Sequence, residues 1–316
     1  MVYVLFVIGF VFLIYGANFL VDGSASLAKK FNISNIVIGL TIVALGTSSP
    51  ELVVNLVASF QESEDVALGN ILGSNISNIF LILGVSALIF PLTVNNNTHW
   101  KEIPLALLAA VVLLIVANDV LIDGYGTSII TRSDGLILIS FFLLFMHYAL
   151  SIAKLSQPEI YVIKVFSVGR SWLMIIAGIA GLILGGKWIV DGAVVIAAYL
   201  GMSEALISLT IIAIGTSLPE LATCVVAAMK KNPDIVIGNV IGSNIFNIFF
   251  VLGISAVIKP LPFNPVLNFD VYTGIIACTL LFIFLLLPRI RILERWQGGI
   301  FVAIYVAYII ALVVRG

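Results

Sequence analysis

The chain has 316 residues, of which 61% are hydrophobic and only 10% are charged. Soluble domains average roughly 45–50% apolar and about 25% charged residues, so this composition excludes a soluble globular protein. The formal net charge of −1 leaves no basic surface of the kind that binds nucleic acid. The two cysteines, Cys224 and Cys278, lie within apolar runs and are expected to be core residues, not a disulfide or a zinc site. We therefore expect an integral membrane protein.

Ten apolar runs are long enough to cross a bilayer, which takes about 20 residues of helix. They lie near residues 2–21, 36–60, 66–90, 102–120, 134–153, 172–190, 203–229, 235–258, 270–288 and 298–315. Asp22 and Asp191 are expected to close the first and sixth runs as structural end caps. The first run has no basic segment or cleavage site of a signal peptide, so it is expected to be retained. The runs do not alternate as in a membrane β-barrel, so we expect an all-α fold of ten transmembrane helices.

The two halves of the chain repeat each other at an offset of 169 residues, with no gap from residue 22 to residue 91. The clearest matches pair residues 46–51 with 215–220 and residues 69–78 with 238–247. Because each half carries five spans, an odd number, the halves are expected to cross the membrane in opposite orientations. Inverted repeats of this kind are typical of secondary transporters, whose substrate sites lie where the repeats meet.

The domain organisation follows from this repeat. Residues 1–153 are expected to form the first five-helix repeat, 154–171 a cytoplasmic linker, and 172–316 the second, inverted repeat. With the N-terminus outside, the cytoplasmic segments hold eleven lysines and arginines, and the outer segments hold only Arg132, Lys259 and Arg315. This distribution is the expected positive-inside bias. We therefore place the chain in the plasma (inner) membrane, with both termini on the extracytoplasmic side.

Glu51 and Glu220 are the most informative residues, because each follows a proline in the middle of an apolar run. A charged side chain at the bilayer centre costs about 2.5–3.5 kcal/mol on insertion scales, so the two carboxylates are expected to face each other or a bound cation. Each proline lacks an N–H and crowds the carbonyl four residues earlier. The nearby carbonyls expected to lose regular helical partners are those of Ala44, Thr47, Ala213 and Thr216.

Polar residues recur every four positions in the segment that follows each glutamate, so each set forms one stripe on a helix. The two stripes are Asn70, Ser74 and Asn78, and Asn239, Ser243 and Asn247. With the carboxylates, hydroxyls and freed carbonyls, they offer only oxygen ligands, which suit hard cations such as Ca²⁺ and Na⁺. One Ca²⁺ would neutralise the two glutamates, and several Na⁺ could occupy the same oxygens instead. The two carboxyls could also hold protons.

At these residues the chain resembles the calcium/cation antiporter superfamily, and within it the prokaryotic sodium/calcium exchanger branch. The resemblance implies a secondary active antiporter that exchanges Ca²⁺ for Na⁺ by alternating access, in which the first and sixth spans move over the other eight. It also implies an ion site centred on Glu51 and Glu220. The further ligands that we assign to this site are Thr47, Thr216, Ser48, Ser217, Ser74, Ser243, Asn78, Asn247, Ala44 and Ala213.

One position departs from part of the family, because some members carry an aspartate where this chain has Asn247. A Ca²⁺/H⁺ antiporter on the same scaffold is therefore the alternative. A cation channel is a second alternative, against which the inverted halves argue. An intramembrane hydrolase with two acidic residues is a third, which would not need duplicated polar segments. We expect no enzyme and no cofactor, with Ca²⁺, Na⁺ and the lipid bilayer as partners and no nucleic acid.

Overall fold

The computed structural model describes residues 2–60, 64–124, 126–153, 164–199, 215–286 and 291–315. Within these ranges the chain is mostly helical, as expected, with two antiparallel ribbons of two-residue strands that the sequence did not indicate. The helices of the first half are α1 (Val2–Phe31), α2 (Asn35–Ile38), α3 (Ala44–Thr47), α4 (Ser49–Phe60), α5 (Glu64–Ser77), α6 (Gly84–Ile89), α7 (Ile103–Val116), α8 (Asp119–Asp123) and α9 (Arg132–Ile152). Those of the second half are α10 (Val168–Tyr199), α13 (Leu218–Met229), α14 (Pro233–Ile245), α15 (Gly253–Ile258), α16 (Asn268–Leu286) and α17 (Arg295–Arg315).

Short π-helical segments interrupt several spans, and the strands join their ends. The π-helical segments are η1 (Gly39–Val43), η2 (Asn78–Leu83), η3 (Thr98–Glu102) and η6 (Phe246–Leu252), and η7 (Pro265–Leu267) is a 3₁₀ turn. Strand β1 (Leu92–Thr93) pairs with β4 (Ile292–Leu293), and β2 (Ile129–Ile130) pairs with β3 (Leu261–Pro262). Each ribbon therefore ties a segment of the first half to one of the second half.

Eight helical spans in the described residues are long and apolar enough to cross a membrane. A ninth is added if the pair Asn35–Thr47 and Ser49–Phe60, bent by 45° at Ser48, counts as one span. The run expected near 36–60 is therefore broken and not a continuous helix. For the run expected near 203–229, the described residues include only the part from Gly215 onwards, with α13 as its helix.

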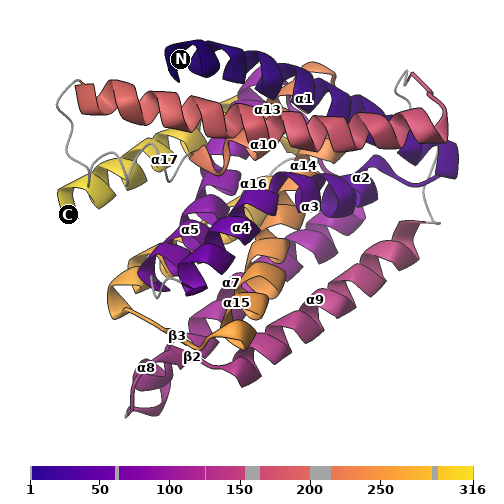
Figure 1. Cartoon of the computed structure of the whole chain (residues 1–316). Helices are drawn as coiled ribbons and strands as arrows, with labels where there is room; N and C mark the ends of the chain where they lie inside the picture. The colour runs from indigo at the N-terminus through magenta and orange to yellow at the C-terminus, as the bar shows by residue number, and fades with distance from the viewer. Residues whose placement is uncertain are drawn as a thin grey trace.

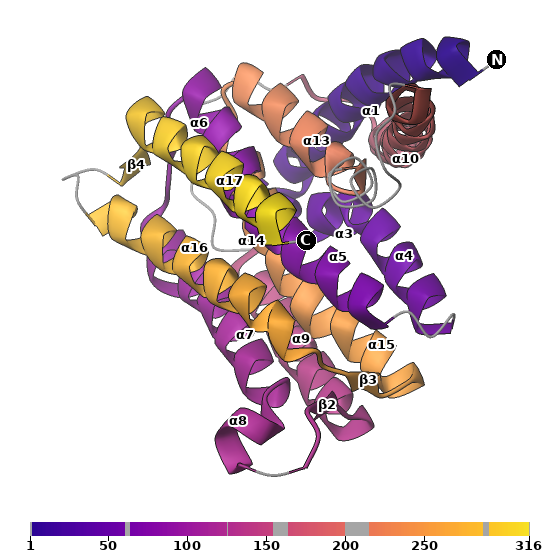
Figure 2. The same cartoon turned by 90° about the vertical axis from the view of Figure 1, so that its left-hand side faces the viewer.

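Helices α1 and α10 lie side by side and cover one face of the molecule (Figures 1 and 2). Their backbones approach so closely that a Cβ built on Gly16 would lie 2.9 Å from the Gly178 carbonyl oxygen. The expectation that Asp22 and Asp191 end these spans is wrong, because both helices continue for two or more turns beyond them. Asp22 is partly exposed, and its carboxylate lies 2.7 Å from the ammonium of Lys230.

The 169-residue offset of the sequence reappears in the boundaries of the elements. Shifted by 169 residues, α4 falls on α13, α6 falls on α15 and β1 falls on β3, each with the same first and last residue. The π-helical segments η2 and η6 also correspond, and each follows the last residue of the helix before it. The continuous spans α5–η2–α6 and α14–η6–α15 are largely buried, whereas the other full-length spans expose most of their residues. These two spans form the centre of the fold.

Glycines let α14 lie directly against the segment that leads to Glu51. A Cβ on Gly238 would lie 2.6 Å from the Ile36 carbonyl oxygen, and one on Gly242 would lie 2.6 Å from that of Leu40. Small residues at helix crossings allow this backbone approach within membranes. The crossing determines which residues of α14 lie opposite α3 and the break at Ser48.

We expect Gly242→Ala to lower the midpoint temperature of unfolding (Tm) of the protein in detergent. The added methyl group would meet the Leu40 carbonyl oxygen at 2.6 Å and the Ala44 Cβ at 2.8 Å, and overpacking of this kind costs about 1–3 kcal/mol. Gly299→Ala is the matched control, because the nearest atom to its new Cβ, in Leu88, is 3.9 Å away. Equal Tm values for the two variants, measured by tryptophan fluorescence, would contradict the close backbone approach at Gly242.

Candidate functional site

The site is built around two buried carboxylates in the first turns of two helices. Glu51 lies at the start of α4 and is 0% exposed, and Glu220 lies at the start of α13 and is 1% exposed. The amino end of a helix carries a partial positive charge that favours an acidic residue in its first turn. The helix break before each glutamate therefore places an electrostatically favourable backbone beside a carboxylate that has lost its water.

Serine hydroxyls hold one oxygen of each carboxylate. The Ser48 hydroxyl lies 2.8 Å from Glu220 Oε1, and the Ser74 hydroxyl lies 3.1 Å from Glu51 Oε1. Ser48 stands at the break between α3 and α4, so the first half of the chain binds the carboxylate of the second half. This contact brings together residues that the sequence separates by more than half of its length.

Several contacts across the site occur in pairs whose members differ by the 169-residue offset. The Thr47 hydroxyl donates to Asn239 Oδ1 (3.0 Å), and the Thr216 hydroxyl donates to Asn70 Oδ1 (3.1 Å). In the same way, Ser48 lies 2.8 Å from Ser243, and Ser217 lies 3.1 Å from Ser74. Such reciprocal contacts are those of a self-complementary interface, in which each half offers the other the same surface.

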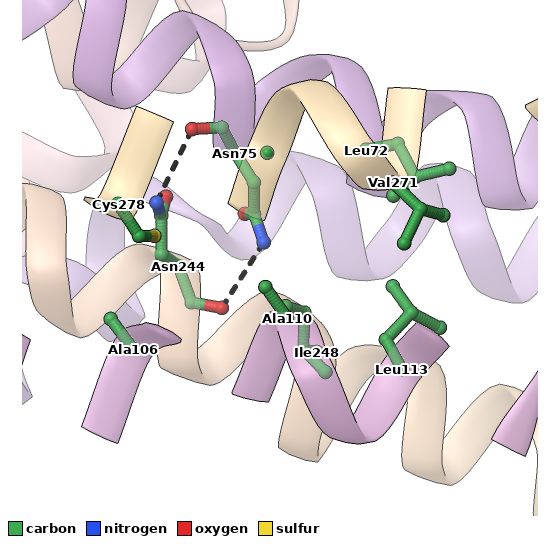
Figure 3. A pocket seen from close by; sticks show the side chains of 10 residues that line it. Leu72, Asn75, Ala106, Ala110, Leu113, Asn244, Ile248, Val271 and Cys278 are labelled. Carbon is green, nitrogen blue, oxygen red and sulfur yellow. Dashed lines mark hydrogen bonds between the residues drawn. The ribbon is translucent and has the colours of Figure 1, made fainter. Parts of the chain in front are cut away.

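Four asparagines form a further reciprocal set next to these contacts. The Asn75 amide donates to the backbone carbonyl of Asn244 (3.3 Å), and the Asn244 amide donates to that of Asn75 (3.2 Å), as the dashed lines in Figure 3 show. Asn78 donates to Asn244 Oδ1 (2.8 Å), and Asn247 donates to Asn75 Oδ1 (3.1 Å). The sequence analysis included Asn78 and Asn247 but missed Asn75 and Asn244, although these two also match at the 169-residue offset.

Four buried oxygen atoms of this site have no hydrogen-bond partner within the described residues. They are Glu51 Oε2, Glu220 Oε2, Asn78 Oδ1 and Asn247 Oδ1. A buried polar atom without a partner is costly, and an ion or an ordered water is the usual reason that one persists. Carboxylate and amide oxygens are the ligands of hard cations such as Ca²⁺. No group of three or more histidine, cysteine, aspartate or glutamate side chains that could hold a metal occurs in the described ranges.

The backbone at the first break differs in one respect from the expectation. The Ala44 carbonyl keeps a regular helical bond, because it accepts from the Ser48 N–H at 2.9 Å. The carbonyl that Pro50 deprives of an N–H is that of Gly46, and the Ser49 hydroxyl donates to it at 2.5 Å. Ala213, expected to be the equivalent of Ala44, lies outside the described residues. At the second break, Leu218 stands in place of Ser49 and has no hydroxyl to donate.

Comparison with known proteins gives consistent matches over nearly the whole chain. The family model described as sodium/calcium exchanger protein matches residues 1–151 and 170–314. The putative antiporter CaxA of Alkalimonas amylolytica is 37% identical over 311 residues, which cover 95% of each chain. The sodium/calcium exchanger MaX1 of Methanosarcina acetivorans is 29% identical over an alignment of 343 positions, which covers 98% of each chain. A solved structure of the sodium-calcium exchanger NCX_Mj, soaked with 10 mM Na⁺ and zero Ca²⁺, has a TM-score of 0.85 at 34% identity, over 99% of this chain and 100% of that chain.

We expect Ca²⁺ to raise the Tm of the purified protein, because a cation would satisfy the four buried oxygens only in the folded state. A ligand at 100 times its dissociation constant stabilises a protein by about 2.7 kcal/mol. Glu220→Gln should remove most of this shift in a thermal scan with and without Ca²⁺. Glu294→Gln changes an exposed carboxylate and should retain it. An undiminished shift in the Glu220→Gln variant would show that Ca²⁺ binds elsewhere.

Proposed function

Because this chain belongs to the sodium/calcium exchanger protein family, we propose that it is a secondary active antiporter that exchanges Ca²⁺ for Na⁺ across the membrane. The observation that carries the proposal is the set of four buried oxygens, two from each half of the chain, for which the described residues supply no hydrogen-bond partner. They combine two carboxylates with two amides, so the site holds a formal charge of −2 before any ion enters. One Ca²⁺ neutralises that charge.

The proposed ion site uses the oxygen atoms that surround the two glutamates. Its members are Glu51, Glu220, Thr47, Thr216, Ser48, Ser217, Ser74, Ser243, Asn78, Asn247, Ala44 and Ala213. Ca²⁺ takes about six to eight oxygen ligands, and this set can supply them from carboxylates, amides, hydroxyls and carbonyls. Several Na⁺ ions would use the same oxygens in its place. Exchange follows from this sharing, because a site occupied by one kind of ion excludes the other.

We further propose that residues 1–153 and 172–316 are inverted repeats of five transmembrane helices each. The reciprocal contacts at the 169-residue offset and the matching boundaries of α4 and α13 support this arrangement. The segment 154–171, of which 154–163 lies outside the described residues, would be a cytoplasmic linker. Both termini would lie on the extracytoplasmic side of the plasma (inner) membrane.

Alternating access would open the site to one side of the membrane at a time. Helices α1 and α10 are the candidates for the moving part, because neither holds a proposed ligand. Their glycines hold them tightly to each other, at distances such as the 2.9 Å between the Gly16 Cβ position and the Gly178 carbonyl oxygen. The pair would therefore move as one unit over the helices that carry the ions.

We expect ⁴⁵Ca²⁺ uptake into proteoliposomes that are loaded with Na⁺ and diluted into Na⁺-free buffer. An opposing gradient is required because the site would hold either Ca²⁺ or Na⁺. A parallel set of vesicles carries a pH gradient and no Na⁺. Uptake only with internal Na⁺ supports sodium/calcium exchange. Uptake with the pH gradient alone would instead support the Ca²⁺/H⁺ antiporter, in which the two neighbouring carboxyls share protons.

Glu51→Gln and Glu220→Gln should each lower the Na⁺-dependent uptake by about 100-fold or more. Removing one partner of a buried charge arrangement costs about 3–5 kcal/mol, and each 1.4 kcal/mol is a factor of ten. Glu102→Gln is the matched control. Glu102 is also buried in a span, but it accepts a hydrogen bond from Tyr148 and touches none of the proposed ligands in the described contacts. Substantial exchange in both glutamate variants would reject the proposed site.

A further inference from the structure

Hydrogen bonds between four asparagines at the centre of the fold fix the orientation of each amide: Asn75 and Asn244 close a ring with each other, and Asn78 and Asn247 each donate to one member of it. Asn75 and Asn244 donate to each other's backbone carbonyl, and a carbonyl oxygen can only accept. Their Nδ2 atoms must therefore point at these carbonyls. The Oδ1 of Asn75 then faces Asn247, and the Oδ1 of Asn244 faces Asn78.

This constraint passes to the other two asparagines. Because Asn244 and Asn75 present oxygen, Asn78 and Asn247 must approach with nitrogen, at 2.8 Å and 3.1 Å respectively. The Oδ1 atoms of Asn78 and Asn247 are thereby turned away from the ring, and neither has a hydrogen-bond partner in the part of the chain that the structure describes. An amide rotated by half a turn would place an NH₂ group there instead.

The ring is joined to the carboxylates through the residues next to it. Ser74 precedes Asn75, and its hydroxyl lies 3.1 Å from Glu51 Oε1. Asn78 follows Ser74 by four residues, so the two side chains share one face of the helix. In the second half, Asn247 follows by four residues Ser243, whose hydroxyl lies 2.8 Å from that of Ser48. The oxygens that the ring turns outward therefore lie along the stripes that reach the glutamates.

A small cavity borders the two amides. It has a volume of about 20 Å³ and is lined by Asn75 and Asn244 and otherwise by small or apolar residues, among them Leu72, Leu113 and Ile248 (Figure 3). This volume admits about one water molecule. Among the described contacts, the Nδ2 atoms of Asn75 and Asn244 have each other's backbone carbonyl as acceptor, which keeps the two amides in one orientation.

We propose that Asn75 and Asn244 are positioning residues that force Asn247 and Asn78 to present oxygen, and not nitrogen, to the transported cation. The inference rests on the proposed function, since it matters only if a cation occupies the site. A cation binds to an amide oxygen and is repelled by an amide NH₂ group. Outer residues that orient a metal ligand typically contribute about 10- to 100-fold to metal affinity.

The test is a double-mutant cycle read by equilibrium binding of ⁴⁵Ca²⁺ to the purified full chain. Asn75→Ala should raise the dissociation constant of Ca²⁺ about tenfold or more, because the Asn247 amide loses the acceptor that orients it. In an Asn247→Asp background the same substitution should change it less than about twofold, because a carboxylate has an oxygen at both positions. Asn244→Ala with Asn78→Asp is the independent cycle in the other half, and either cycle that yields folded protein decides the question.

The matched control is a second reciprocal amide pair, Asn118 with Asn268, at 2.8 Å and 2.7 Å, whose contacts involve none of the site residues. Asn268→Ala should leave Ca²⁺ binding unchanged. A tenfold loss in Asn75→Ala that persists in the Asn247→Asp background would mean that Asn75 acts through packing, and it would overturn the inference, as would unchanged binding in Asn75→Ala. The proposed function fails separately, if the unsubstituted chain binds no Ca²⁺ or if Glu51→Gln binds it equally well.

Discussion

The burial of two carboxylates among apolar helices is the constraint on which the rest of this structure depends. A carboxylate that has lost its water needs compensation from nearby dipoles, hydrogen bonds or a counter-ion. The break before Glu51 supplies a helix amino end, Ser48 and Ser74 supply hydroxyls, and one oxygen of each carboxylate has no hydrogen-bond partner among the described residues. The close helix crossing at Gly242 keeps these groups at a fixed separation. The helix crossing, the helix break and the serine hydroxyls therefore all contribute to the surroundings of the same two carboxylates.

Much of this arrangement could be predicted from the sequence, because a charge in an apolar run is expensive and the chain shows it twice at one offset. The helical membrane fold followed from the apolar runs and the break near Pro50 from the N–H that this proline lacks, whereas the closeness of Glu220 to residues of the first half followed from the cost of burying a charge. The duplication mattered as much, because a single buried glutamate has many explanations. The assignment of individual ligands stays a prediction, since it depends on the bound ion.

Other features could not be predicted, because they arise only when the two halves pack together. Asn75 matches Asn244 at the 169-residue offset, but nothing in the sequence indicates that the two side chains bond each other's backbone. Asp22 resembles the end of a span, but its helix continues to Phe31, and its carboxylate pairs with Lys230 far along the chain. The sequence also did not indicate that the Ser49 hydroxyl donates to the Gly46 carbonyl, which Pro50 leaves without an N–H donor. Long-range pairing and hydroxyl geometry leave no periodic signal.

The ion pair between Lys230 and Asp22 has a consequence for the balance between the two ends of a transport cycle. In a carrier made of two inverted halves, the outward-open and inward-open forms exchange the roles of the halves, so identical halves would make the two forms isoenergetic. Asp191 matches Asp22, but the position equivalent to Lys230 is Gln61, which carries no charge. An exposed pair contributes about 0.2–1 kcal/mol, or up to about a fivefold population ratio. If the two repeats of the proposed exchanger interchange in this way, this contact would contribute to a preferred resting side.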